Sequence, residues 1–326
     1  MSRFEGLPPD YDPWFVLSAR TAPEGGALAA AVVGDPAFPL NAARELVVLV
    51  HGFNNHMGEA GAAYASFRDH QYPLAGVSPP SLETEFADFF WPGDADMGLL
   101  DKLDFTVYPE AVHTSPAAGQ RLASYLATLP NLLTIDFVGH SLGCRVVLEC
   151  IRQMVQGPHP VIRRVVLMAA AVPVDMVSTG GTLASAVQAA EQVLVLHSTS
   201  DIVLHFAFPP GQTQAGEGML PTALGRFGPP PGMPGVVLAQ QITDAGHGDY
   251  WGVEDAGTTP ASAAVHQAVA TAVAASLKLG SITRDAATPR GSGATTLVSY
   301  PRQAASVREI PSRTVGSKAQ ALPLGR

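Results

Sequence analysis

The sequence Gly-His-Ser-Leu-Gly at residues 139–143 lies between an apolar run and a segment with helical periodicity. A serine hydroxyl is a weak nucleophile, so catalysis requires that it stand clear of the sheet beside a general base. A strand that turns sharply into a helix presents it in this way, and glycine at positions 139 and 143 avoids collision with neighbouring backbone. The pattern therefore predicts a nucleophile elbow in which Ser141 attacks, near a helix N-terminus that favours negative charge.

A second pattern, His51-Gly52-Phe53, follows the apolar run 45–50. Attack on an acyl carbon creates an oxyanion, which two N–H donors must stabilise. We expect these donors to be the backbone N–H groups of Phe53 and of Leu142, the residue after the serine; the alternative is a strand that merely ends in a turn. Structural roles at the site are expected for His51, Gly52, Gly139, His140 and Gly143.

The general base and its acid partner should follow Ser141 in the order serine, acid, histidine. His247 comes directly after a predicted strand, and glycines flank it, so a short loop can bring its imidazole toward Ser141. Asp201 follows the preceding predicted strand and would hold the imidazole in one tautomer. Asp175, which follows an earlier strand, is the alternative acid.

Strands and helices alternate along most of the chain. Apolar, β-branched runs between turn residues predict strands, and longer amphipathic segments predict helices. The alternation predicts an α/β fold, a mostly parallel sheet with helices on both faces. The strands are expected at 14–19, 27–33, 45–50, 86–91, 133–138, 163–170, 192–198 and 235–242, and the helices at 58–70, 115–129 (with Ser115 as N-cap and Pro116 at the first position), 142–156, 181–191 and 260–279.

Two segments break the alternation. Residues 206–235 are rich in Pro and Gly and show neither helix nor strand pattern, so we expect an irregular loop, either a lid over the site or a surface excursion. Residues 281–326 carry six arginines and one lysine against two acidic residues, with few large apolar side chains. They are expected to form a flexible basic tail after a domain spanning 1–280.

Composition excludes several classes of function. The net charge is −9, which disfavours nucleic acid as a partner. No long apolar run predicts a membrane span, and no apolar leader opens the sequence. Two cysteines, Cys144 and Cys150, point to different sides of one predicted helix, which fits a reducing, cytoplasmic location without a disulfide. No nucleotide-binding or metal-binding motif occurs, so neither a cofactor nor a metal is expected.

These motifs resemble the α/β-hydrolase superfamily, with HGF after a buried strand, GHSLG at 139–143 and GH before Gly248. The combination of HGFNN, WPGD and GHSLGCRV also resembles a bacterial α/β-hydrolase family of unassigned function. In that family a Trp-Pro-Ser motif follows the fourth strand, whereas Gly93 stands in place of the serine here. The resemblance covers about residues 40–255 and implies a Ser-His-Asp triad, but it implies no substrate.

We therefore expect a serine hydrolase that cleaves small carboxylic esters, similar to esterases and lipases. Thioesterase, amidase and acyltransferase activities use the same triad and stay open as alternatives. A different class of alternative is a non-catalytic, hydrolase-like scaffold that binds a partner through the basic tail. The sequence leaves acyl-chain length and oligomeric state open.

Overall fold

A computed structural model describes residue 7 and residues 15–34, 40–76, 85–94, 108–254 and 257–279. Within these ranges the strands form an eight-stranded sheet in the order β2-β1-β4-β3-β5-β6-β7-β8. Strand β2 runs antiparallel to β1, and every other neighbouring pair is parallel. The strands are β1 (Phe15–Arg20), β2 (Leu28–Gly34), β3 (Glu45–Val50), β4 (Glu85–Phe90), β5 (Thr134–His140), β6 (Val161–Met168), β7 (Gln192–His197) and β8 (Val237–Gln241).

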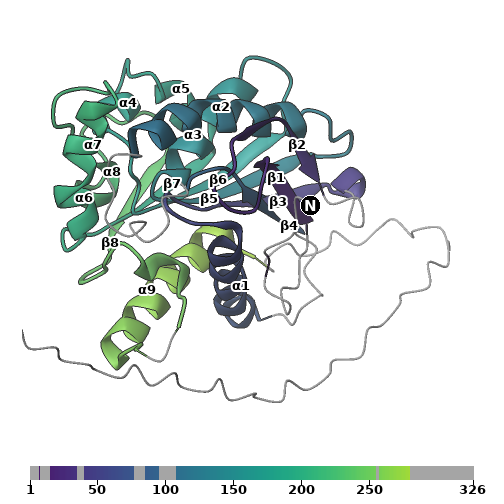
Figure 1. The fold of residues 1–326 in the computed structure, drawn as a ribbon. Coiled ribbons are helices and arrows are strands. Elements are labelled where there is room, and N and C mark those ends of the chain that lie inside the picture. Colours follow the sequence, from purple (N-terminus) through teal and green to yellow (C-terminus); the bar gives the residue numbers. More distant parts are fainter. Residues whose placement is uncertain are drawn as a thin grey trace, which may run out of the picture. The chain divides into compact units, whose positions relative to one another are not determined.

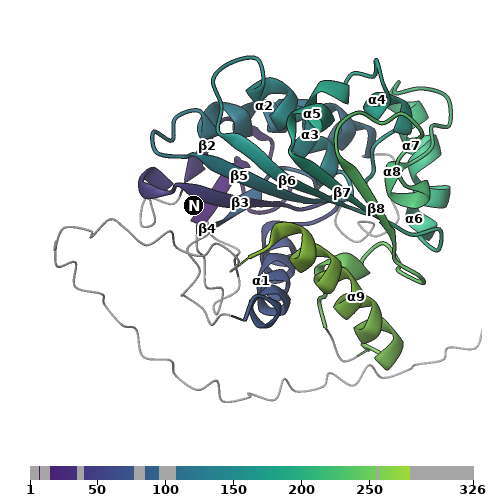
Figure 2. The same ribbon diagram turned by 180° about the vertical axis from the view of Figure 1, so that it is seen from behind.

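Helices cover both faces of the sheet, as Figures 1 and 2 show. Helices α2 (Tyr108–Leu126) and α3 (Gly143–Met154) pack together on one face, and α1 (Met57–Leu74) and α9 (Pro260–Leu277) pack on the other. This arrangement confirms the predicted fold class. The shorter elements are η1 (Leu40–Ala42), α4 (Val174–Val177), α5 (Ala184–Ala189), α6 (Ile202–Phe206), α7 (Phe208–Gln214), α8 (Leu224–Phe227) and η3 (Asp249–Trp251).

Burial of the central strands explains their composition. Residues 46–50 of β3 are fully buried, as a strand covered by helices on both faces must be. Close packing of α2 on α3 depends on Gly119, where a Cβ atom would lie 2.7 Å from the carbonyl oxygen of Val146. The apolar runs of the central strands are thus the centre of the core, whereas β8 at the edge of the sheet is mostly exposed.

The parallel order brings four loops to one edge of the sheet. Strands β3, β5, β7 and β8 end at the same side because they run in the same direction. The residues that follow them are His51, Ser141, Asp201 and His247 within their respective loops. Open α/β sheets carry their sites at this carboxyl edge.

Helix α2 begins earlier than the sequence predicted. Ser115 and Pro116 were expected to start it, but both lie inside a helix that begins at Tyr108. Pro116 has no N–H to donate to the carbonyl of Val112, one turn earlier. The buried hydroxyl of Ser115 donates to that carbonyl at 2.8 Å instead, so the helix continues through the proline.

The Pro- and Gly-rich segment 206–235 is also more regular than predicted. It contains α7 and α8, so the expectation of a segment without helices was wrong. Pro209 and Pro210 lie in the first turn of α7, where a missing N–H leaves no hydrogen bond unmade. Gly211 lets the Tyr108 ring pack closely, since a Cβ atom there would lie 2.5 Å from Cδ1 of the ring. The predicted tail 281–326 lies outside the described residues.

Two further expectations concern cysteines and membranes. Cys144 and Cys150 are both free and buried, and burial raises the pKa of each thiol. The absence of a disulfide between them is thereby confirmed. In the part of the chain that the structure describes, no helix is both long enough and apolar enough to cross a bilayer.

Replacing Ser115 should show how much its hydrogen bond to Val112 stabilises α2 at Pro116. In Ser115→Ala the buried carbonyl of Val112 loses its donor, so the free energy of unfolding should fall by about 1–2 kcal/mol. Ser124→Ala is the matched control, because the exposed Ser124 hydroxyl donates to a carbonyl within a regular helical turn. Urea unfolding measures both variants, and equal stabilities would contradict this role for Ser115.

Candidate active site

Ser141, His247 and Asp201 form a continuous chain of hydrogen bonds. The Nε2 atom of His247 lies 2.8 Å from Oγ of Ser141, and its Nδ1 atom lies 2.8 Å from Oδ2 of Asp201. The Nδ1–H group donates to the carboxylate, which leaves Nε2 free to accept the serine proton. This is the geometry that a nucleophile, a general base and an orienting acid require.

The turn at Ser141 is held in an unfavourable conformation. Ser141 has a φ of +52°, in the left-handed region that non-glycine residues rarely adopt. Its N–H donates to the carbonyl of Met168 at 2.9 Å, and its carbonyl accepts from Ala171 at 3.1 Å, which ties the turn to the end of β6. Such strain persists only where surrounding contacts determine the conformation.

Two glycines permit this turn, as the sequence predicted. A Cβ atom at Gly143 would overlap with the carbonyl oxygen of His51 and lie 2.5 Å from that of Val50. At Gly139 a Cβ atom would lie 3.0 Å from Cα of Cys144. The first turn of α3 therefore touches the end of β3 directly, backbone against backbone.

Asp201 is held in place by contacts besides its hydrogen bond to His247. It is fully buried, and its Oδ1 atom accepts the N–H of Leu204 at 2.9 Å, so the same carboxylate caps α6. Arg226 donates to the backbone carbonyl of Asp201 at 2.7 Å. The alternative acid, Asp175, is exposed in α4, and no contact in the described part of the chain joins it to His247. The structure therefore brings Asp201, and not Asp175, to the histidine.

The two expected oxyanion donors belong to Leu142, which follows Ser141, and to Phe53, which follows Gly52. Among the described residues, neither the N–H of Phe53 nor that of Leu142 donates to another protein group. Gly52 lies against the nucleophile, because a Cβ atom there would be 2.8 Å from Cβ of Ser141. Close approach of this backbone to the reacting group is what an oxyanion-stabilising donor needs.

His51 controls the direction of the Phe53 N–H. Its Nδ1–H donates to the carbonyl of Gly52 at 2.9 Å, and its Nε2 accepts the N–H of Trp91 at 3.3 Å. The Gly52 carbonyl and the Phe53 N–H belong to one planar peptide and point in opposite directions. Fixing the carbonyl therefore turns the N–H away from the imidazole, which agrees with the structural role expected for His51.

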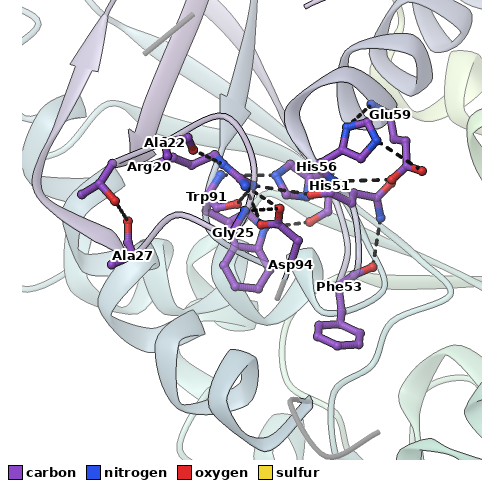
Figure 3. A network of polar contacts seen from close by, with 12 residues as sticks. Arg20, Ala22, Gly25, Ala27, His51, Phe53, His56, Glu59, Trp91 and Asp94 are labelled. Atoms are coloured by element: carbon purple, nitrogen blue, oxygen red, sulfur yellow. Dashed lines mark hydrogen bonds and ion pairs between the residues drawn. The ribbon is translucent and has the colours of Figure 1, made fainter. Parts of the chain in front are cut away.

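An ion pair between Arg20 and Asp94 lies beside this loop, as Figure 3 shows. The guanidinium of Arg20, fully buried at the end of β1, lies 2.5 Å from Oδ1 of Asp94. Arg20 also donates to the carbonyl of Trp91 at 3.0 Å, and the N–H of Asn54 donates to the carbonyl of Gly93 at 2.7 Å. The Trp-Pro-Gly-Asp motif thus connects the end of β1 to the loop after β3. The sequence contains that motif but offers no signal for Arg20.

Burial keeps two imidazoles at the site neutral. Desolvation, with a smaller contribution from Arg20, lowers the pKa of His51 to about 4. Desolvation and the neighbouring His247 lower the pKa of His140 to about 3. Neither can serve as a base near neutral pH. Across the described ranges, no group of three or more metal-ligating side chains gathers around one point.

Residues 37–207, just over half of the chain, match the family described as "Alpha/beta hydrolase of unknown function (DUF900)". The chain belongs to this family. The match agrees with the sheet order and confirms the resemblance to α/β hydrolases that the sequence indicated. No curated protein matches this α/β hydrolase at a significant level.

Solved structures similar to this α/β hydrolase include esterases. The Pyrobaculum calidifontis esterase is 12% identical with a TM-score of 0.39, covering 72% of this chain and 76% of that one. Carboxyl esterase 2 from the mycorrhizal fungus Tuber melanosporum is 14% identical with a TM-score of 0.39, covering 85% of this chain and 94% of that one.

Stability should fall as the pH is lowered from about 6.5 to 5. The unfolded chain protonates His51 and His140 near their ordinary pKa of about 6.5, whereas the folded chain keeps both neutral. The unfolded state then binds more protons, so each imidazole lowers the free energy of unfolding by up to about 1.4 kcal/mol per pH unit. Urea unfolding across this range measures the slope. A His140→Gln variant should show a shallower slope, and stability that rises toward pH 5 would contradict the neutral burial.

Proposed function

We propose that this α/β hydrolase is a serine hydrolase that cleaves carboxylic esters through an acyl-enzyme. The observation that carries the proposal is the pair of 2.8 Å hydrogen bonds that joins Ser141 through His247 to Asp201. A triad of this kind performs acyl transfer with protein groups alone. The N–H groups of Phe53 and Leu142, which have no hydrogen-bond acceptor among the described residues, support the same chemistry.

The reaction proceeds in two halves. Oγ of Ser141 attacks the acyl carbon while Nε2 of His247 takes its proton, and the carboxylate of Asp201 stabilises the imidazolium. The N–H groups of Phe53 and Leu142 stabilise the oxyanion of the tetrahedral intermediate. The imidazolium then protonates the leaving alcohol. Water, deprotonated by His247, attacks the acyl-enzyme and releases the carboxylic acid, which restores Ser141.

Among the substrate classes considered, an ester needs the least general-acid catalysis from such a site. An alcohol leaves with less help from the general acid than an amine does, so an unspecialised triad hydrolyses esters most readily. Thioesterase, amidase and acyltransferase activities remain alternatives on the same residues. A non-catalytic scaffold would need neither the hydrogen-bonded triad nor the free donors. The free, buried thiols fit a reducing compartment, and we propose the cytoplasm.

Ser141→Ala should abolish turnover of a short-chain p-nitrophenyl ester. Loss of the nucleophile is expected to lower kcat by about 10⁴-fold or more, by comparison with other triads, while circular dichroism is unchanged. Labelling with a fluorophosphonate, followed by peptide mapping, should modify Ser141 in the wild-type protein and nothing in the variant. A folded variant that keeps its turnover or its label would refute the assignment.

Substitutions at Asp201 and at Asp175 test which aspartate is the acid of the proposed triad. Asp201→Asn should lower kcat by about 10⁴-fold, because an amide in place of the carboxylate favours the wrong imidazole tautomer. Asp175→Asn, the matched exposed control, should leave kcat within about a factor of two, as surface changes away from a site usually do. If activity depends on Asp175 and tolerates the change at Asp201, the acid has been assigned to the wrong strand.

A further inference from the structure

His140, the residue immediately before the nucleophile, contacts the backbone of the histidine loop. Its Nε2 atom lies 2.8 Å from the carbonyl oxygen of His247, a residue 107 positions away in the sequence. An imidazole nitrogen that faces a carbonyl oxygen must carry the proton, so His140 donates this hydrogen bond. The last residue of β5 therefore holds the main chain of the residue whose side chain contacts Ser141.

The ring of His140 is held tightly in place. The residue is 6% exposed, and its ring centroid lies 5.1 Å from that of His247, 6.0 Å from that of Tyr250 and 5.9 Å from that of Trp251. On the opposite side, a Cβ atom at Gly52 would lie 3.1 Å from Nδ1 of His140. A ring enclosed in this way has little freedom to change its hydrogen-bonding direction.

The loop that carries His247 has a second, independent anchor. The Oδ2 atom of Asp249 accepts the N–H of Gly246 at 2.7 Å, which closes the turn around the histidine. This contact shapes the loop internally, whereas the contact from His140 ties the loop to β5. The contact from His140 therefore acts on the position of the loop relative to β5, whereas this contact of Asp249 acts on the internal shape of the loop.

The protonation state of His140 suits this task. Its pKa of about 3 leaves it neutral, with one N–H, at every pH at which a histidine base works. A neutral donor keeps the loop in position without placing a second positive charge beside the imidazolium that forms on His247. A cation at the same place would oppose that imidazolium.

We infer that His140 is a positioning residue, which holds the main chain of His247 so that its imidazole stays within reach of Ser141. The inference rests on the proposed function, because it assigns His247 as the base. Displacing a catalytic group by about 1 Å costs about 10²-fold in rate. A glutamine at position 140 can place its amide N–H₂ near the position of Nε2, whereas a phenylalanine fills the same space without a donor.

The test compares His140→Phe with His140→Gln in steady-state ester hydrolysis. We expect kcat to fall by about 10- to 100-fold in His140→Phe with KM unchanged, and the rate of fluorophosphonate labelling to fall in proportion. His140→Gln should recover most of both rates. Tyr250→Phe is the packing control, because it keeps the ring beside His140 and removes a hydroxyl that has no partner within the described residues.

Thermal unfolding of each variant separates a positioning role from a structural one. If folded His140→Phe keeps the wild-type kcat and labelling rate, or if His140→Gln loses as much as His140→Phe at equal stability, the inference is wrong. A wild-type protein that neither turns over esters nor labels at Ser141 would refute the proposed function itself. The wild-type measurement therefore distinguishes the two failures.

Discussion

The close contact between the start of α3 and the end of β3 determines the geometry of the candidate site. At Gly143 the helix backbone lies against the carbonyls of His51 and Val50, where no Cβ atom fits. This contact places the strained turn at Ser141 beside the loop that carries Phe53. The spacing between Ser141 and Phe53, the proposed nucleophile and the proposed oxyanion donor, is thus set by two backbones in contact.

Buried polar groups preserve that geometry because each of them is costly to leave without a partner. The loop after β3 depends on three such groups, which are His51, Arg20 and Asp94. Their hydrogen bonds and ion pair offset the cost of removing them from water. Any rotation of the Gly52 peptide would break the bond from His51. Donors oriented before substrate binds need no reorganisation during the reaction, which is the main advantage of such a site.

The histidine loop is the part of the site that the strands position least directly. His247 lies beyond β8, at the edge of the sheet, and in the proposed triad its imidazole must reach Ser141, which follows the central strand β5. Asp201 holds the side chain from β7, and His140 holds the main chain from β5. The loop that carries His247 is thereby held at both its side chain and its main chain.

The sequence alone determined the features that depend on local pattern. Alternating apolar runs predicted the parallel sheet, and the glycines around Ser141 predicted the elbow, because both requirements act within about ten residues. Chain order, together with the position of the preceding strand, favoured His247 and Asp201 and left Asp175 as the alternative acid. Only the tertiary structure showed that Asp201 lies against the imidazole.

Other features could be decided only by tertiary contacts. The sequence predicted Pro116 at the start of a helix, but it lies inside α2, where the hydroxyl of Ser115 donates to the carbonyl of Val112. The pair Arg20–Asp94 and the bond from His140 to His247 join residues 74 and 107 positions apart. Such contacts leave no periodic or local signature in a sequence, because they arise from how the strands are ordered in the sheet.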